Sequence, residues 1–187
     1  MARRIAILGS RQPVQLAAAA AALVAAAVTP AAAEPAAALQ PQVQADLGLA
    51  VIGLGYERPV AEHLALQLEG QIFGTYFLPW FDAGDNAAGL GAELRATWFA
   101  RPSGHGLYVL AYGRADAVRI ERDALTADGF AVSGGGAAGW SLRLTRRLDL
   151  RLGIGAQYLY ARAETAGTRL GASTPFVTLD AVLGYRL

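Results

Sequence analysis

The chain has 187 residues, of which 54% are hydrophobic, and its formal net charge is +1. It contains no cysteine, which excludes disulfides and thiolate chemistry, and its mean hydropathy of +0.31 is high for a soluble domain. After residue 40 no apolar run is long enough for a membrane helix, so this hydrophobicity points to strands. Beyond residue 33 there are 13 arginines and 15 acidic residues, a net charge of −2 that argues against a nucleic-acid surface.

The first 33 residues have the layout of a secretory signal peptide. Arg3, Arg4 and Arg11 precede an apolar run at residues 16–28, and small residues follow up to Ala33. A basic start, a short apolar segment and small residues before the cleavage site are the three parts of such a peptide. We expect Sec-type export and cleavage after Ala33. Twin-arginine export, and an uncleaved alanine-rich helix or anchor, remain alternatives.

The first predicted strand covers residues 43–58 and changes phase in its middle. Apolar side chains occupy odd positions up to Val51 and even positions from Ile52 onward. Successive side chains of a strand point to opposite faces, so a slip of one residue reverses the faces unless a β-bulge absorbs it. We therefore predict a bulge near Gly53. Two alternatives stay open: a reversal of the chain at Val51, or a weak additional strand at residues 36–44.

Six further strands follow from the alternation of apolar and polar residues. They cover residues 63–77, 89–101, 107–119, 130–145, 148–160 and 174–187. Short turns near residues 60, 104 and 146 alternate with long polar loops at 78–88, 120–129 and 162–173. Short turns at one end and long loops at the other are typical of outer-membrane barrels.

The segment 148–160 has the clearest alternation. Leu150, Leu152 and Ile154 share one face, while Asp149 and Arg151 lie on the other. The segment is longer than the roughly 5 to 6 residues of an ordinary strand and reaches the about 9 to 11 that cross a bilayer. The fold class that we predict for residues 34–187 is all-β: a closed antiparallel up-and-down transmembrane β-barrel of about eight strands, apolar outside and polar inside.

Aromatic residues on the apolar faces fall into two groups. Near the short turns lie Tyr56, Trp98, Trp140 and Tyr185, and near the long loops lie Tyr76, Phe130, Tyr158 and Tyr160. Amphipathic rings prefer the two interfaces of a membrane, so we predict two aromatic belts.

The polar faces carry many charges. They comprise Glu69, Glu93, Arg95, Arg114, Asp116, Arg143, Asp149, Arg151, Asp180 and Arg186. Unpaired charge inside a narrow barrel is costly, and eight strands enclose little more than their own side chains. We therefore expect a network of ion pairs that plugs the lumen.

We expect no catalytic, cofactor-binding or metal-binding site. His63 and His105 fall at predicted short turns, and neither has a neighbouring histidine or cysteine as a co-ligand. We expect both to be solvated turn residues. Trp80 and Phe81 in the first long loop offer a contact surface for a ligand.

The leader, the strand-turn-strand IGLGYERPVAEHLALQLEG at 52–70 and the closing LDAVLGYRL at 179–187 together resemble the small outer-membrane β-barrel families, which include the OmpA-like transmembrane domain. The resemblance implies a porin-like, monomeric barrel in the outer membrane of a Gram-negative cell, in contact with lipid. It also implies recognition by the barrel-assembly machinery through the last strand. There Leu179, Ala181, Leu183 and Tyr185 occupy alternate positions, and Leu187 stands where Phe is usual.

The function that we expect is a structural or surface-interaction role without enzymatic activity. Three alternatives remain: a small pore or ligand transporter, a lipid-modifying outer-membrane enzyme, and a soluble periplasmic barrel that binds a lipid inside. The last requires every strand to have its faces reversed.

Overall fold

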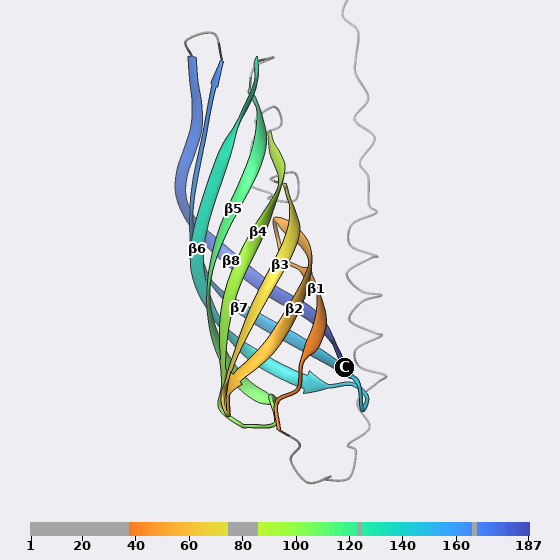
Figure 1. Ribbon diagram of the computed structural model, residues 1–187. Coiled ribbons are helices and arrows are strands. Elements are labelled where there is room, and N and C mark those ends of the chain that lie inside the picture. Colours follow the sequence, from red (N-terminus) through yellow and green to blue (C-terminus); the bar gives the residue numbers. More distant parts are fainter. Residues whose placement is uncertain (1–37, 75–85, 123–124, 166–167) are drawn as a thin grey trace, which may run out of the picture. The chain divides into compact units, whose positions relative to one another are not determined.

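The chain folds into a single ring of eight antiparallel strands (Figure 1). The computed structural model describes residues 38–74, 86–122, 125–165 and 168–187. The strands are β1 (Gln42–Leu47), β2 (Val51–Ala61), β3 (Leu64–Gly74), β4 (Asn86–Phe99), β5 (Gly106–Arg122), β6 (Leu125–Arg143), β7 (Leu148–Thr165) and β8 (Thr168–Arg186). Each strand pairs with the next, and β1 pairs with β8, so the predicted closed barrel is confirmed. The closing contact is short: it runs from Gln42 opposite Arg186 to Asp46 opposite Val182, and the earlier part of β8 pairs with β7 alone.

Several predicted features fall outside the described residues. They are the signal peptide at 1–33, the aromatic belt residue Tyr76, and the loop residues Trp80 and Phe81. Among the described residues, no helix is both long and apolar enough to cross a membrane.

The predicted strand at 43–58 is two strands, so the bulge near Gly53 is wrong and the reversal of the chain is right. β1 ends at Leu47 and β2 begins at Val51, and their register runs without interruption from Leu47 opposite Ile52 to Gln42 opposite Glu57. Residues directly opposite each other share a face. Leu47 and Ile52 are opposite each other, so an odd-numbered position of β1 and an even-numbered position of β2 share the outer face. The apolar residues therefore move from odd to even positions at this reversal, as they would at a bulge.

This reversal supplies the eighth strand. Gln42 at the start of β1 pairs with Arg186 at the end of β8, so the barrel begins and ends at the same end. The connections after β2, β4 and β6 lie there too, and we call this the short-turn end. Gly104 in the turn between β4 and β5 and Gly106 at the start of β5 have φ angles of 75° and 86°, which residues other than glycine adopt only with strain.

The predicted long loops at 120–129 and 162–173 are wrong, because the strands continue through them. β5 runs to Arg122 and β6 starts at Leu125, while β7 runs to Thr165 and β8 starts at Thr168. These four strands have 17 to 19 residues, and Figure 1 shows their two hairpins extending past the neighbouring strands. We call these extensions the arms. Their outward faces carry charges, so the apolar alternation that marks the strands elsewhere disappears.

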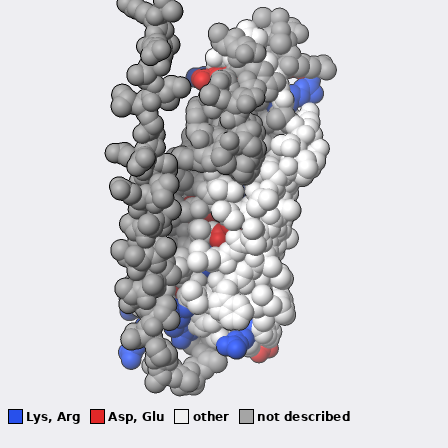
Figure 2. Space-filling model, turned by 180° about the vertical axis from the view of Figure 1, so that it is seen from behind, with Lys and Arg blue, Asp and Glu red and all other residues white. Residues whose placement is uncertain are grey.

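The barrel is apolar outside and polar inside, as predicted. Leu90 and Leu94 point outward and are 67% and 60% exposed, whereas Arg95 and Arg151 point inward and are 2% and 3% exposed. Figure 2 shows a broad white area without charge on the visible face, and most of the blue and red atoms in this view lie near its two ends. A soluble barrel with a lipid inside requires the opposite arrangement.

The seven belt residues that the structure describes all lie on the outer surface. The exposed group toward the short-turn end is Tyr56, Trp98, Trp140 and Tyr185, and the exposed group toward the arms is Phe130, Tyr158 and Tyr160. Within the second group the rings of Phe130 and Tyr160 lie 6.1 Å apart. An uncharged zone on the outer surface thus has aromatic rings along both borders.

Candidate functional site

The polar faces of the strands meet inside the barrel, where their charged side chains form several hydrogen-bonded groups. Nine of the ten predicted interior residues are buried, and Arg143 is half-buried. The nine are Glu69, Glu93, Arg95, Arg114, Asp116, Asp149, Arg151, Asp180 and Arg186. The structure adds Asp46 and Glu57, which are buried in the same space.

Arg95 on β4 links strands from opposite sides of the barrel. Its Nε donates to Glu93 Oε1 at 2.7 Å, its Nη1 donates to Asp180 Oδ1 on β8 at 3.0 Å, and its Nη2 donates to Asp46 on β1. Glu93 also accepts from Nε of Arg114 on β5. Charge-assisted bonds of this kind are stronger than neutral ones, so the centre of the barrel is tied together across its width.

Two tyrosines and a glutamine extend this network. The Tyr108 hydroxyl donates to Asp180, and the Tyr112 hydroxyl donates to Gln157 Oε1 at 2.9 Å. The Arg114 guanidinium lies 4.4 Å from the centre of the Tyr112 ring. The aromatic rings therefore fill interior space and also satisfy polar groups.

A bidentate ion pair lies closer to the short-turn end. Arg151 on β7 donates from Nη1 and Nη2 to the two oxygens of Glu57 on β2, both at 2.6 Å. Its guanidinium carbon also lies 4.8 Å from the centre of the Phe99 ring. This geometry fixes two strands that are not neighbours in the sheet.

A second bidentate pair lies at the short-turn end itself. Arg186 donates from Nε and Nη2 to the oxygens of Asp149, at 2.7 and 2.9 Å. Gln42 Nε2 donates to the same carboxylate at 3.0 Å. The last strand is thereby joined to β7 and β1 beside the barrel closure.

The side chains of the two histidines contact other residues and are only partly exposed to solvent. The side chain of His105 is only 18% exposed, and its Nε2 lies 3.4 Å from Asp149 and accepts from Arg143 Nε at 3.0 Å. His63 is half-buried, with Nδ1 2.7 Å from the Phe99 carbonyl oxygen and its ring stacked on Trp98. The expectation of plain solvated turn residues is therefore wrong for both, because each ring is in contact with neighbouring residues.

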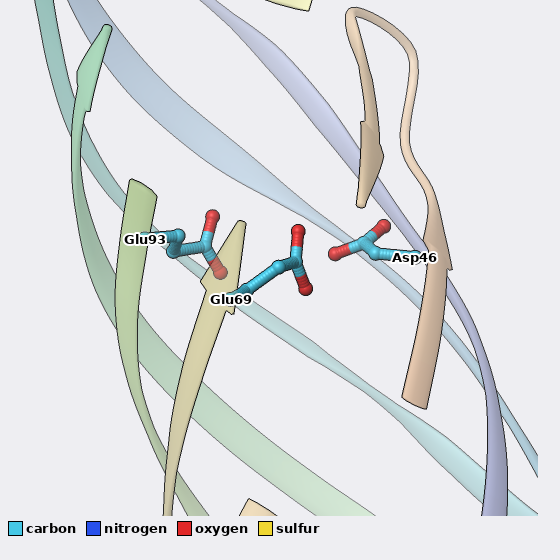
Figure 3. A group of neighbouring side chains, drawn as sticks. All are labelled: Asp46, Glu69 and Glu93. Carbon is cyan, nitrogen blue, oxygen red and sulfur yellow. The ribbon is translucent and has the colours of Figure 1, made fainter. Parts of the chain in front are cut away.

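Three carboxylates from three strands meet near the middle of the barrel. Asp46, Glu69 and Glu93 each place an oxygen within 4.8 Å of the other two, and we call them the carboxylate cluster (Figure 3). Glu69 accepts from Gln67 Nε2 at 2.7 Å, but its Oε1 has no donor among the described residues. A Cβ on Gly53 would lie 1.9 Å from this Oε1, so Glu69 can hold its present position only with a glycine at 53 on the adjacent strand.

The interior carries more negative than positive charge. Among the described residues, seven buried carboxylates face four buried guanidinium groups. Arg151 and Arg186 form bidentate pairs with one carboxylate each toward the short-turn end. Arg95 and Arg114 are therefore the buried guanidinium groups that remain for the other five buried carboxylates of the described residues. An uncompensated charge in a buried site is costly unless a proton or a cation offsets it. Within this excess, the oxygens of the carboxylate cluster are close enough for one ion to contact all three residues.

Sequence reasoning did not select Asp46 or Glu57 as interior residues. Both lie in the segment 43–58, for which the alternation predicts one strand with a bulge. When the alternation is applied to β1 and β2 separately, it predicts that both residues point inward. Asp46 lies between the outward residues Ala45 and Leu47, and Glu57 follows the outward Tyr56.

No protein-family model matches the chain, and no curated protein matches it. Among solved structures, the chain is similar to Neisserial surface protein A (NspA), with 14% sequence identity and a TM-score of 0.45. That similarity covers 79% of this chain and 95% of that chain.

Proposed function

We propose that this chain is an integral β-barrel of the outer membrane of a Gram-negative bacterium. The observation that supports this placement is the apolar outer surface, to which all eight strands contribute. Exposed large apolar residues on successive strands are Leu47, Leu54, Leu68, Leu90, Val109, Val132, Ile154 and Leu179. In water such a continuous apolar surface promotes association, whereas in lipid it is the stable arrangement for a closed barrel.

The spacing of the aromatic rings supports the same placement. On β6, Phe130 and Trp140 lie ten positions apart on one face, and both are exposed. At about 3.4 Å per residue and a tilt of about 45°, ten residues rise about 24 Å along the barrel axis. The apolar band of an outer-membrane barrel is about 25 Å tall with aromatic girdles at its borders.

Two measurements test the placement. In membrane fractions, the folded barrel should be found with the outer membrane and should migrate faster on a gel before boiling than after it. A single cysteine at Glu121 in an arm should react with an impermeant maleimide on intact cells, whereas one at Arg146 in a short turn should react only after lysis. Recovery of the protein wholly from the soluble periplasm would contradict the proposal.

We propose further that the barrel is filled and does not conduct. The ion pairs of Arg95 and Arg151 cross the interior, and both side chains are almost fully buried. Toward the arms, the interior is apolar, with Val118, Ile120 and Leu159 in one buried cluster. Purified protein in planar bilayers should give no steady current. A stable conductance of nanosiemens order would favour the alternative of a small pore.

The role that we propose is structural or surface-interacting and not enzymatic. β6 continues five residues past Phe130 and β7 continues five past Tyr160, which extends the arms about 12 Å above the aromatic rings. Arg119 donates to Asp128 Oδ1 at 2.8 Å on this outer surface, and this ion pair holds the pKa of Asp128 below its ordinary value. Charged, projecting hairpins suit contact with other molecules outside the cell. Both histidines lie at the opposite end, away from lipid of the outer leaflet.

A further inference from the structure

The carboxylate cluster has an incomplete set of positive partners. Asp46 and Glu93 both accept from Arg95, and Glu93 also accepts from Arg114. Glu69 lies among them with only the neutral amide of Gln67 as a described donor. The two arginines therefore leave at least one carboxylate of the cluster without a counter-charge.

A second observation is the set of buried oxygen atoms without donors. Asp46 Oδ1 and Glu69 Oε1 have no hydrogen-bond partner within the described part of the chain, and their residues are 1% and 2% exposed. On the same two strands, the amide oxygens of Gln44 and Gln67 also lack a described donor. Figure 3 shows the carboxyl groups of Asp46 and Glu69 turned toward each other. All four of these unsatisfied atoms are oxygens that accept hydrogen bonds. A cation binds to such oxygens, whereas an anion needs hydrogen-bond donors.

We propose that Asp46, Glu69 and Glu93 bind one calcium ion inside the barrel. Calcium takes carboxylate and amide oxygens at about 2.3 to 2.6 Å, so two oxygens on opposite sides of the ion lie about 4.6 to 5.2 Å apart. The oxygens of the cluster lie within 4.8 Å of one another, which suits this size. Magnesium needs about 2.0 to 2.1 Å and retains several waters, and zinc prefers nitrogen and sulfur ligands. The ligand set therefore favours calcium.

The ion has a structural consequence at the closure of the barrel. β1 has only six residues and is the strand that joins β2 to β8. A calcium ion bound by Asp46 on β1, Glu69 on β3 and Glu93 on β4 connects this short strand with β3 and β4, neither of which is its neighbour in the ring. Calcium binding is thus coupled to closure of the ring, and this goes beyond the proposed membrane function.

The test uses the folded barrel in detergent, stripped with a chelator and titrated with calcium by calorimetry. We expect one calcium per chain. Glu69→Gln keeps the shape of the side chain and an oxygen for Gln67, but removes the charge, and should weaken calcium binding at least tenfold. Asp128→Asn removes the same charge on the outer surface of β6 and should bind calcium as the wild type does. Faster migration of unboiled samples verifies that each variant is folded.

A thermal unfolding measurement gives an independent result. Calcium should raise the midpoint of the wild type by several degrees relative to chelator, and should leave that of Glu69→Gln unchanged. In chelator, Glu69→Gln should unfold at a higher temperature than the wild type, because one of several like charges is gone. Absence of bound calcium in the wild type, equal binding by Glu69→Gln, or equal affinity for magnesium would overturn the proposal.

A final measurement covers the case in which Glu69→Gln does not fold. Wild-type protein dialysed against low calcium is compared in its folded and heat-unfolded forms, and calcium is measured by atomic emission. We expect one calcium per folded chain and none per unfolded chain. Equal contents in both forms would count against an interior site.

Discussion

Replacement of Leu94 by arginine tests whether the outer surface of the barrel contacts lipid. Leu94 on β4 is 60% exposed and lies four residues from Trp98, which borders the short-turn end. Four residues rise about 10 Å at a tilt of about 45°, close to the middle of a band about 25 Å tall. Arginine at the bilayer midplane costs about 2 to 4 kcal/mol of folding free energy. On a soluble protein, a substitution at an exposed position changes stability by about 0.5 kcal/mol or less.

The assay is a urea titration of folding into phospholipid vesicles, in which the folded fraction is read from gel mobility. Leu125→Arg is the matched control, since Leu125 is also exposed but lies in an arm, five residues beyond Phe130. Its cost should be about 0 to 1 kcal/mol, because the penalty falls toward the interface. Equal free energies of unfolding for Leu94→Arg and the wild type would refute the assignment of this surface to lipid.

Two further substitutions test the interior. Arg151→Ala leaves the buried carboxylate of Glu57 without its bidentate partner and should cost about 3 to 5 kcal/mol of unfolding free energy in the same titration; a loss below about 1 kcal/mol would contradict a buried pair. Gly53→Ala brings a Cβ to within 1.9 Å of Glu69 Oε1 and should cost about 1 to 3 kcal/mol, whereas Gly70→Ala, with open space around its Cβ, should be tolerated. Addition of Glu69→Ala to Gly53→Ala should restore part of the loss, and no recovery would show that the clash lies elsewhere.

The fold could be predicted wherever a strand crosses the apolar zone. In β7, Leu152 and Ile154 face outward while Arg151 faces inward, and that alternation is visible in the sequence. An apolar outer surface and a charged interior give each position a definite polarity. The same alternation predicts which residues face outward in every predicted strand except the first.

The sequence was ambiguous where two backbone geometries give the same pattern. The change of phase at Val51 arises equally from a bulge and from a tight reversal with Leu47 opposite Ile52. Pairing with β8 decides between them, and that pairing joins residues about 140 positions apart in the chain. No local signal carries this information.

The arms were missed because their environment differs from that of the barrel wall. Arg119 and Asp128 face outward where both solvent and polar partners are available, so a strand there has no apolar outer face. The residues resemble a polar loop, although their backbone pairs continuously from Arg122 opposite Leu125.

The carboxylate cluster could not be predicted because its members have no characteristic spacing. Asp46, Glu69 and Glu93 are brought together by barrel closure and by the register of β3 with β4, which sets Glu69 opposite Glu93. The alternation predicts that Glu69 and Glu93 point inward, but it predicts neither their height in the barrel nor their neighbours.

The most direct test of the central claim is a spin-label measurement in vesicles, which the cysteine-free chain makes simple. Nitroxides placed singly at Leu54, Leu68 and Leu94, on three strands, are compared with one at Glu121 in an arm. The account predicts that the first three collide more often with oxygen dissolved in the membrane than with a water-soluble nickel complex, and that Glu121 shows the reverse. Greater access of the nickel complex at Leu54, Leu68 and Leu94 would contradict a barrel that faces lipid.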